Sequence, residues 1–88
     1  MADPFSHALK IARSKHGDRM VVCEPVAAVP NEGGGVISLP MGTQLRVKHA
    51  CDSWLFADAA MADGAIKHVS FGVEEFGALE IESRGHNG

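Results

Sequence analysis

The clearest pattern in the chain is the alternation of apolar and polar residues between positions 42 and 71. Within residues 44–50, Leu45, Val47 and His49 fall on one face of an extended segment, and polar or charged side chains fall on the other. A repeat of two residues is typical of a strand that has one buried and one exposed face. We therefore expect residues 44–50 to form a half-buried β-strand.

Two further strands are predicted to follow. Residues 51–53 are expected to form a turn, residues 54–60 the next strand, and residues 65–71 its return strand. The turn between the last two contains Asp63-Gly64, a pair that strongly favours a tight β-hairpin. Trp54 is the single tryptophan of a chain that is poor in aromatic residues. We expect its indole to be the centre of the hydrophobic core, packed among aliphatic side chains.

The segments on either side predict shorter β elements. Residues 19–29 predict a first strand. Because proline donates no ladder hydrogen bond, Pro25 either places the later half at an edge or a bulge or ends the strand there. Residues 30–35 contain three consecutive glycines and predict a flexible loop. A short strand at 36–39, a helical turn at 72–77 and a last strand at 79–82 complete the pattern.

An amphipathic helix is predicted over residues 3–17. Asp3 can cap its first amides, Pro4 suits its first turn, and Gly17 suits the position after its last residue. Apolar residues at helical spacing form one narrow stripe, which consists of Phe5, Ala8, Leu9 and Ala12. A helix of this length needs tertiary packing. The stripe is therefore expected to lie on the β-sheet or, in a homodimer, on a second copy of the chain.

The order of these elements resembles that of the small SH3-like β-barrels, including their bacterial members, over residues 20–82. The residues that carry the resemblance are Gly42-Thr43 and Val47 in one strand, Trp54 opening the next, Gly64 in the hairpin, and Glu74-Glu75-Phe76 before the last strand. The resemblance implies an α+β fold, with the N-terminal helix packed on a small five-stranded antiparallel SH3-like barrel or bent sheet. Such barrels commonly bind peptides, cell-wall fragments or nucleic acid. The chain lacks the tyrosines that line the groove of polyproline-binding members, which argues against that ligand.

The length of 88 residues predicts a single domain, with the helix at 3–17, the barrel at 20–83 and a frayed tail at 84–88. Residues 1–20 hold four cationic side chains against two carboxylates, whereas residues 21–88 hold four against nine. A basic arm on an acidic body is thus predicted. Two cysteines are too few for a disulfide framework, and no apolar run suits a signal peptide or a membrane span. We therefore expect a cytoplasmic protein with no membrane contact.

Residues with reactive or metal-binding side chains give little sign of catalysis. Zinc-binding residue types occur at Cys23, His49, Cys51 and His68. No two of them form the closely spaced pair on a turn that is typical of structural zinc sites. Phosphate-loop, nucleophile-elbow and paired-carboxylate motifs are also lacking. We expect no metal, no cofactor and no enzymatic activity, and a small zinc- or cysteine-dependent enzyme is the least favoured alternative.

The leading hypothesis is therefore a non-enzymatic protein-binding module, such as an accessory or inhibitor protein that occupies a partner's surface. The predicted protein-binding residues are Asp52, Trp54, Glu74, Glu75 and Phe76. The first alternative is a nucleic-acid-binding barrel, in which basic side chains contact phosphate groups. The predicted nucleic-acid-binding residues are Lys10, Arg13, Lys15, Arg46 and Lys48. The sequence does not identify the partner.

Overall fold

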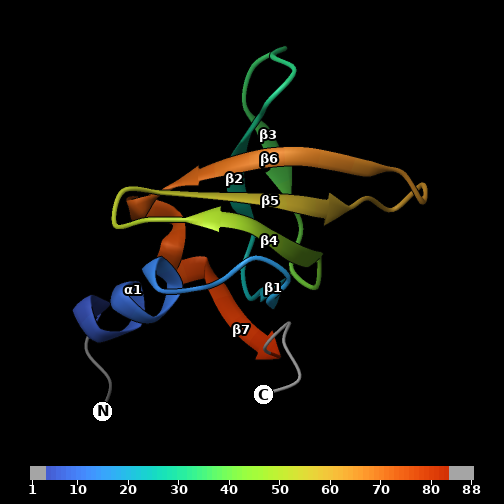
Figure 1. The fold of residues 1–88 in the computed structure, drawn as a ribbon. Helices are drawn as coiled ribbons and strands as arrows, with labels where there is room; N and C mark the ends of the chain where they lie inside the picture. Colours follow the sequence, from blue (N-terminus) through green and yellow to red (C-terminus); the bar gives the residue numbers. More distant parts are fainter. Residues whose placement is uncertain (1–3, 84–88) are drawn as a thin grey trace.

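The computed structural model describes residues 4–83 as a curled antiparallel sheet with a short helix beside it (Figure 1). The α-helix α1 spans Pro4–Ala12, and a 3-10 helix, η1, spans Val73–Ala78. The strands are β1 (Arg19–Val22), β2 (Val26–Pro30), β3 (Ile37–Leu39), β4 (Gln44–Ala50), β5 (Trp54–Ala60), β6 (Ile66–Gly72) and β7 (Leu79–Ser83).

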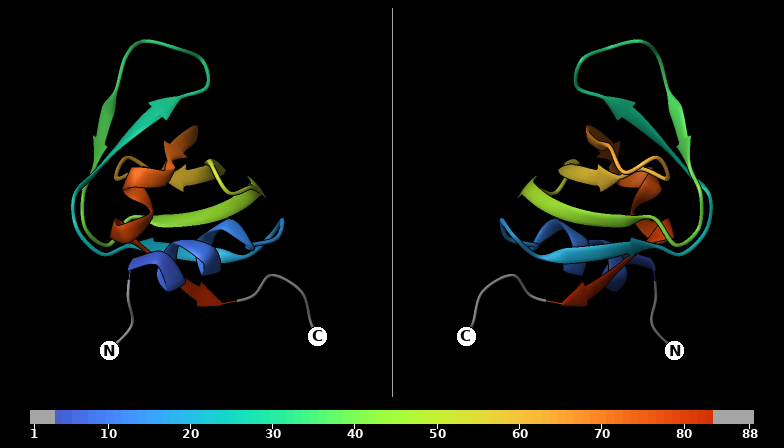
Figure 2. Two further views of the ribbon diagram at one scale, coloured as in Figure 1. Left: turned by 90° about the vertical axis from the view of Figure 1, so that its left-hand side faces the viewer. Right: turned by 90° about the vertical axis from the view of Figure 1, so that its right-hand side faces the viewer.

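The sheet curls because a short link joins strands that lie far apart in it. The strands are ordered β3-β2-β6-β5-β4-β1-β7 across the sheet. Only residues 23–25 connect β1 to β2, yet β4, β5 and β6 lie between those two strands in the sheet. The short link draws the two sides of the sheet toward each other. The strands consequently form a half-barrel that wraps around the core (Figure 2).

The sheet has seven strands, so the prediction of a five-stranded sheet is wrong. The predicted first strand is divided in two, because a bend at Cys23 and Glu24, just before Pro25, separates β1 from β2. β2 then pairs with β3 and with β6, which adds a hairpin to one side of the sheet. This hairpin projects beyond the remaining strands, with its glycine-rich loop at the tip (Figure 2). The strands predicted at 44–50, 54–60 and 65–71 are present as β4, β5 and β6.

The core lies inside the curl and is centred on phenylalanine. Phe71 of β6 and Phe76 of η1 are each 1 % exposed and are the largest fully buried side chains. Trp54 is 47 % exposed, so the prediction that its indole forms the centre of the core is wrong. Each fully buried phenylalanine contributes about 1.5–3 kcal/mol of hydrophobic stabilisation. The two phenylalanines therefore take the role that the sequence pattern assigned to the indole.

α1 is shorter than the helix predicted over residues 3–17, since it ends at Ala12. The chain leaves the helix because Gly17 and Asp18 form backbone hydrogen bonds with Val47 of β4, at 2.8 Å each. Asp18 is almost fully buried, and its carboxylate accepts a hydrogen bond of 3.0 Å from the Lys15 amide. The expected cap, Asp3, lies outside the described residues, as does the tail predicted at 84–88.

The helix packs on its own chain, against η1, β5 and β7. Among residues 6–12 of the helix the buried side chain is Ile11, which is 0 % exposed, and Ala8 and Ala12 pack against the core as well; the side chain of Phe5 lies outside the described ones. His7 fastens the helix further, because its Nε2 lies 3.1 Å from the carbonyl oxygen of Phe76 and 2.6 Å from that of Leu79. Both neighbours are acceptors, so Nε2 carries the proton and donates to them. Within residues 4–83, no helix is both long and apolar enough to span a membrane.

Candidate functional site

β5 presents alternate residues to the core and to solvent. Leu55, Ala57 and Ala59 face the core and are at most 1 % exposed. Trp54 and Phe56 face the other way and are 47 % and 36 % exposed. Two aromatic rings thus stand on the solvent side of one strand, two positions apart. We call this side of β4, β5 and β6 the outer face.

A row of side chains crosses the outer face at the level of Phe56. Ser70 of β6 pairs directly with both Phe56 and Val29 of β2, and His49 of β4 pairs with Phe56 on the other side. Directly paired residues of antiparallel strands project to the same face. Val29 is 44 % exposed, and the His49 and Phe56 ring centroids lie 6.3 Å apart. Val29, Phe56 and His49 are therefore exposed in one row, which is interrupted between Val29 and Phe56 by Ser70, a small residue that is only 7 % exposed.

A β-bulge in β4 explains how His49 reaches this row. The pairing between β4 and β5 shifts between Val47 and His49, which leaves Lys48 as an extra residue. A bulge places two residues of one strand opposite one of its partner and re-aims the side chains that follow. Lys48 and His49 are consequently both exposed, while Val47 is fully buried. The prediction that His49 shares the face of Val47 is wrong, because uninterrupted alternation does not anticipate the bulge.

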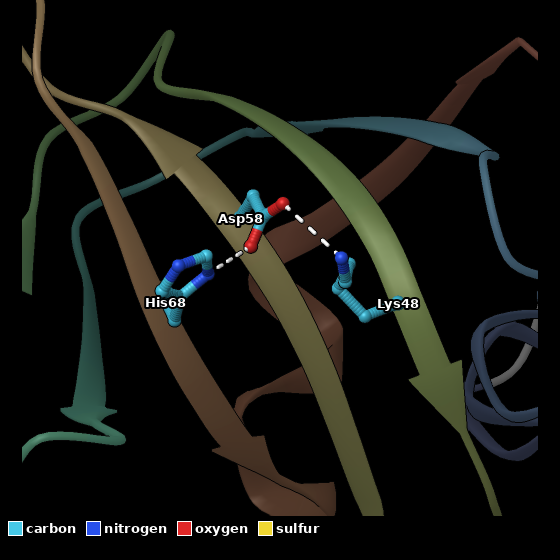
Figure 3. Close-up of polar contacts among 3 residues, drawn as sticks. All are labelled: Lys48, Asp58 and His68. Atoms are coloured by element: carbon cyan, nitrogen blue, oxygen red, sulfur yellow. Dashed lines mark hydrogen bonds and ion pairs between the residues drawn. The ribbon is translucent and has the colours of Figure 1, made fainter.

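A polar cluster of Lys48, Asp58 and His68 also lies on the outer face (Figure 3). Asp58 of β5 stands between Lys48 and His68 of β6. Its Oδ2 lies 3.8 Å from Lys48 Nζ, and its Oδ1 accepts a hydrogen bond from His68 Nδ1. Exposed ion pairs of this kind stabilise a fold by at most about 1 kcal/mol. The main effect of the cluster is therefore to fix where three charged or titratable groups stand.

Gly72 lies opposite Trp54 at the other end of the face. The two residues are direct partners across β5 and β6, so the indole has no side chain opposite it. A Cβ at position 72 would collide with the carboxylate of Glu74, which therefore occupies that space. Glu75 Oε1 accepts a hydrogen bond of 3.1 Å from the Gly72 amide and caps η1. Trp54 and Glu74 are thus both neighbours of Gly72 at this corner of the outer face, and Glu75 caps η1 beside them.

The remaining predicted protein-binding residues lie elsewhere. Asp52 is exposed in the turn that precedes Trp54, where Ser53 Oγ donates to its Oδ1 at 3.4 Å. Phe76 is 1 % exposed and packs in the core, so it offers no surface to a partner.

The sequence reasoning missed Phe56 and the role of Asp58. Asp58 itself carried the missing signal, since a carboxylate in step with Trp54 and Phe56 marks their shared face as the exposed one.

The predicted nucleic-acid-binding residues form two separate groups. Lys10 lies on α1, and Arg13 and Lys15 follow it, whereas Arg46 and Lys48 belong to β4. α1 contributes to the core that the inner face of the sheet encloses, but both β4 residues project from the outer face. The structure therefore does not join the two groups into one basic patch.

The cysteines show no feature of a catalytic or metal site. Cys23 and Cys51 are both free. Partial desolvation raises the pKa of the Cys23 thiol, and the carboxylates of Glu80 and Glu24 raise it further, so the thiolate is scarce at neutral pH. Among residues 4–83, no three His, Cys, Asp or Glu side chains are grouped in a way that would hold a metal ion. His49 and His68 lie instead on the outer face, one beside Phe56 and the other bound to Asp58.

No protein-family model, curated protein or solved structure matches this chain. Its function is therefore argued from the geometry of the outer face.

Proposed function

We propose that the protein binds another protein through the outer face of its sheet and acts without catalysis, as an accessory or inhibitor protein. The observation that carries this proposal is the exposure of Trp54 and Phe56 side by side on β5, at 47 % and 36 %. Exposed apolar patches on a folded domain mark interaction surfaces. Tryptophan is also enriched among the residues that contribute most to protein–protein affinity.

The surroundings of the two rings support the same proposal. Protein interfaces combine an apolar centre with a polar rim. Here Phe56 and Val29 lie near the centre, and Glu74, Asp58 and Lys48 lie around them. The rings stand on a sheet strand that is paired on both sides, so little conformational entropy is lost when a partner binds.

The SH3-like resemblance stays a prediction. Its support is that β4, β5, β6, η1 and β7 follow one another in the order that the resemblance requires. We also infer a cytoplasmic location, which is supported by the two free cysteines, since exposed thiols persist in a reducing compartment.

A second candidate function is the binding of single-stranded nucleic acid. Exposed aromatic rings on a sheet can stack with bases, and the outer face also carries Arg46 and Lys48. The specific observation in its favour is that Trp54 and Phe56 share a face with these two cations. Against it, the carboxylates of Asp58 and Glu74 lie on the same face and repel phosphate groups.

The test uses three forms of the protein, each carrying the same affinity tag. These are the unchanged chain, an outer-face variant with Trp54→Ser and Phe56→Ser, and a control with Val36→Ser and Met41→Ser. The control also removes two exposed apolar side chains, which are 67 % and 69 % exposed but lie outside the outer face. We expect the unchanged chain and the control to retain the same partner in stoichiometric amount from host lysate, and the outer-face variant to lose it.

Equal recovery of that partner by the outer-face variant would contradict the proposal, as would the absence of any partner. Fluorescence anisotropy with a labelled single-stranded oligonucleotide at low salt separates the second candidate. Oligonucleotide binding that disappears in the outer-face variant and weakens steeply with salt would favour nucleic acid over protein.

A further inference from the structure

A pocket opens at the end of the outer face that lies farthest from Trp54. It has a volume of about 440 Å³ and lies between Arg19 of β1 and Arg46 of β4. Asp58, Ala60 and Ile66 line its other side. Because Ala60 is the last residue of β5 and Trp54 is the first, the strand separates this pocket from the indole. The pocket is thus a separate feature that shares only Asp58 with the proposed protein-binding surface.

Two arginines line this pocket, and neither forms an ion pair within the described part of the chain. Arg19 and Arg46 are direct partners across β1 and β4, so their side chains project to the same face. Like charges placed directly opposite each other destabilise a sheet. Neither guanidinium forms an ion pair with any of residues 4–83. Two arginines that have no ion-pair partner among residues 4–83 are therefore held at the pocket.

The carboxylate of Asp58, which lines the pocket, is bound by residues other than the two arginines. Asp58 is the direct partner of Arg46 on β5, a position in which a salt bridge would be expected. Its Oδ1 is instead bound by His68 and its Oδ2 is directed to Lys48 (Figure 3). Asp58 therefore lines the pocket, but its two carboxylate oxygens have partners other than Arg46. This leaves Arg46 with its guanidinium donors available.

The remaining lining residues are the polar Gln44 and the apolar Leu45, Ala60 and Ile66. Ile66 is 60 % exposed and lies directly opposite Ala60, and both line the cavity. Arginine donors arranged as a fork match the two oxygens of a carboxylate or a phosphate. An apolar wall adds affinity only for a ligand that has an aliphatic part to bury. A cavity of this volume is within the usual range for small-ligand sites.

We propose that the pocket binds a carboxylate that is carried on a small aliphatic group. The carboxylate is held by Arg19 and Arg46, and the aliphatic group rests on Ile66 and Ala60. Such a group occurs in a free short-chain acid and at the C-terminus of a peptide that ends in leucine. The two sources share the chemistry that the pocket recognises, and the experiment distinguishes them.

The experiment follows the NMR signals of the arginine side-chain N–H groups and of the Ile66 methyl groups during titration. The probes are isocaproate for a free acid and N-acetyl-leucine for a peptide C-terminus, each with its neutral amide as a control, and inorganic phosphate. We expect one or both carboxylates to shift the arginine and the Ile66 signals together, and the amides to leave them unchanged. The carboxylate that binds identifies the source.

Arginine variants test which side chains bind the carboxylate. Arg19→Gln and Arg46→Gln are each expected to weaken carboxylate binding roughly tenfold or more, because each removes a charge-assisted hydrogen bond. Arg13→Gln is the matched control, since it removes the same charge from an exposed position after α1. A retained NMR fingerprint shows that each variant is folded. Equal weakening by Arg13→Gln would overturn the proposal, because net charge alone would then explain binding.

Two other outcomes would also overturn it. The first is that no probe shifts the arginine or Ile66 signals at millimolar concentrations. The second is that inorganic phosphate binds as tightly as the carboxylates, in which case the apolar wall contributes nothing. Both results are independent of the proposed protein-binding function, because that function is tested with Trp54 and Phe56, which lie outside the pocket.

Discussion

Replacing Trp54 with alanine is expected to cost much less stability than replacing Phe76. The indole is 47 % exposed, so about half of its surface is removed from water when the chain folds. A tryptophan buries at most about 150–250 Å², and half of that area is worth roughly 2–3 kcal/mol as an upper limit. The unfolded chain already buries part of this surface. The expected loss for Trp54→Ala is therefore about 1–2 kcal/mol.

Phe76→Ala removes a side chain that is 1 % exposed and leaves a closed cavity in the core. Substitutions of this type cost about 3–5 kcal/mol, because the lost transfer free energy is joined by a cavity term. A domain of this length has a total stability of about 4–13 kcal/mol. Phe76→Ala is thus expected to remove a large share of that stability, and Trp54→Ala a small share.

Urea unfolding followed by far-ultraviolet circular dichroism measures both losses without relying on the tryptophan signal. The comparison is made between midpoints at equal slope, since a changed slope indicates a change in the unfolded or the native state. A loss for Trp54→Ala that equals the loss for Phe76→Ala would refute the reasoning, because the indole would then be part of the core.

Three further predictions concern other parts of the fold. His7→Ala is expected to lower the free energy of unfolding by about 1–2 kcal/mol, because two carbonyls lose their donor. The control His16→Ala, at an exposed position, should change it by less than about 0.5 kcal/mol. Equal effects would contradict the role of the His7 hydrogen bonds in holding the helix. Gly64→Ala should cost about 1–2 kcal/mol in urea unfolding, because its φ of 88° strains any residue that has a Cβ, and an unchanged midpoint would argue against this turn. In a Cys51→Ser background, the alkylation rate of Cys23 should rise with pH, and the pH at half-maximal rate should be higher in the folded protein than in the urea-unfolded chain, because the folded-state pKa of Cys23 is raised. A lower pH at half-maximal rate would contradict the effect of desolvation and of Glu80 and Glu24 on this thiol.

The central strands could be predicted because their signals are local. Alternation over residues 44–50 and the Asp63-Gly64 turn specify β4, β5 and β6 without reference to distant parts of the chain. Gly64 adopts a positive φ, and its neighbour Asp63 accepts a hydrogen bond of 2.9 Å from the Ala65 amide. Turn chemistry of this kind is contained within a few residues, so the sequence alone is enough.

The division of residues 19–30 could not be predicted in the same way. Pro25 indicated an interruption, but it did not reveal that the chain crosses from one side of the sheet to the other at that point. That crossing depends on β2 pairing with β6, through Val29 and Ser70, which lie far apart in the sequence. The extra strands therefore follow from long-range pairing, for which single residues carry no signal.

The candidate site was predicted only in part, for a reason that can be named. Large aromatic residues are usually buried, and this general tendency placed Trp54 in the core. The alternation within β5 points the other way, because Leu55, Ala57 and Ala59 form a fully apolar face while Asp58 lies on the face of the indole. Residue size was given more weight than the periodicity, and the periodicity was the better guide.

The account depends most on the exposure of the outer face, and Trp54 reports on it directly because it is the single tryptophan. The measurement is acrylamide quenching of tryptophan fluorescence in the folded protein, compared with the urea-unfolded chain. We predict a red-shifted emission and a quenching constant that is a large fraction of the unfolded value. A blue-shifted emission with strongly suppressed quenching in the isolated protein would show a buried indole, and would contradict the proposed binding surface.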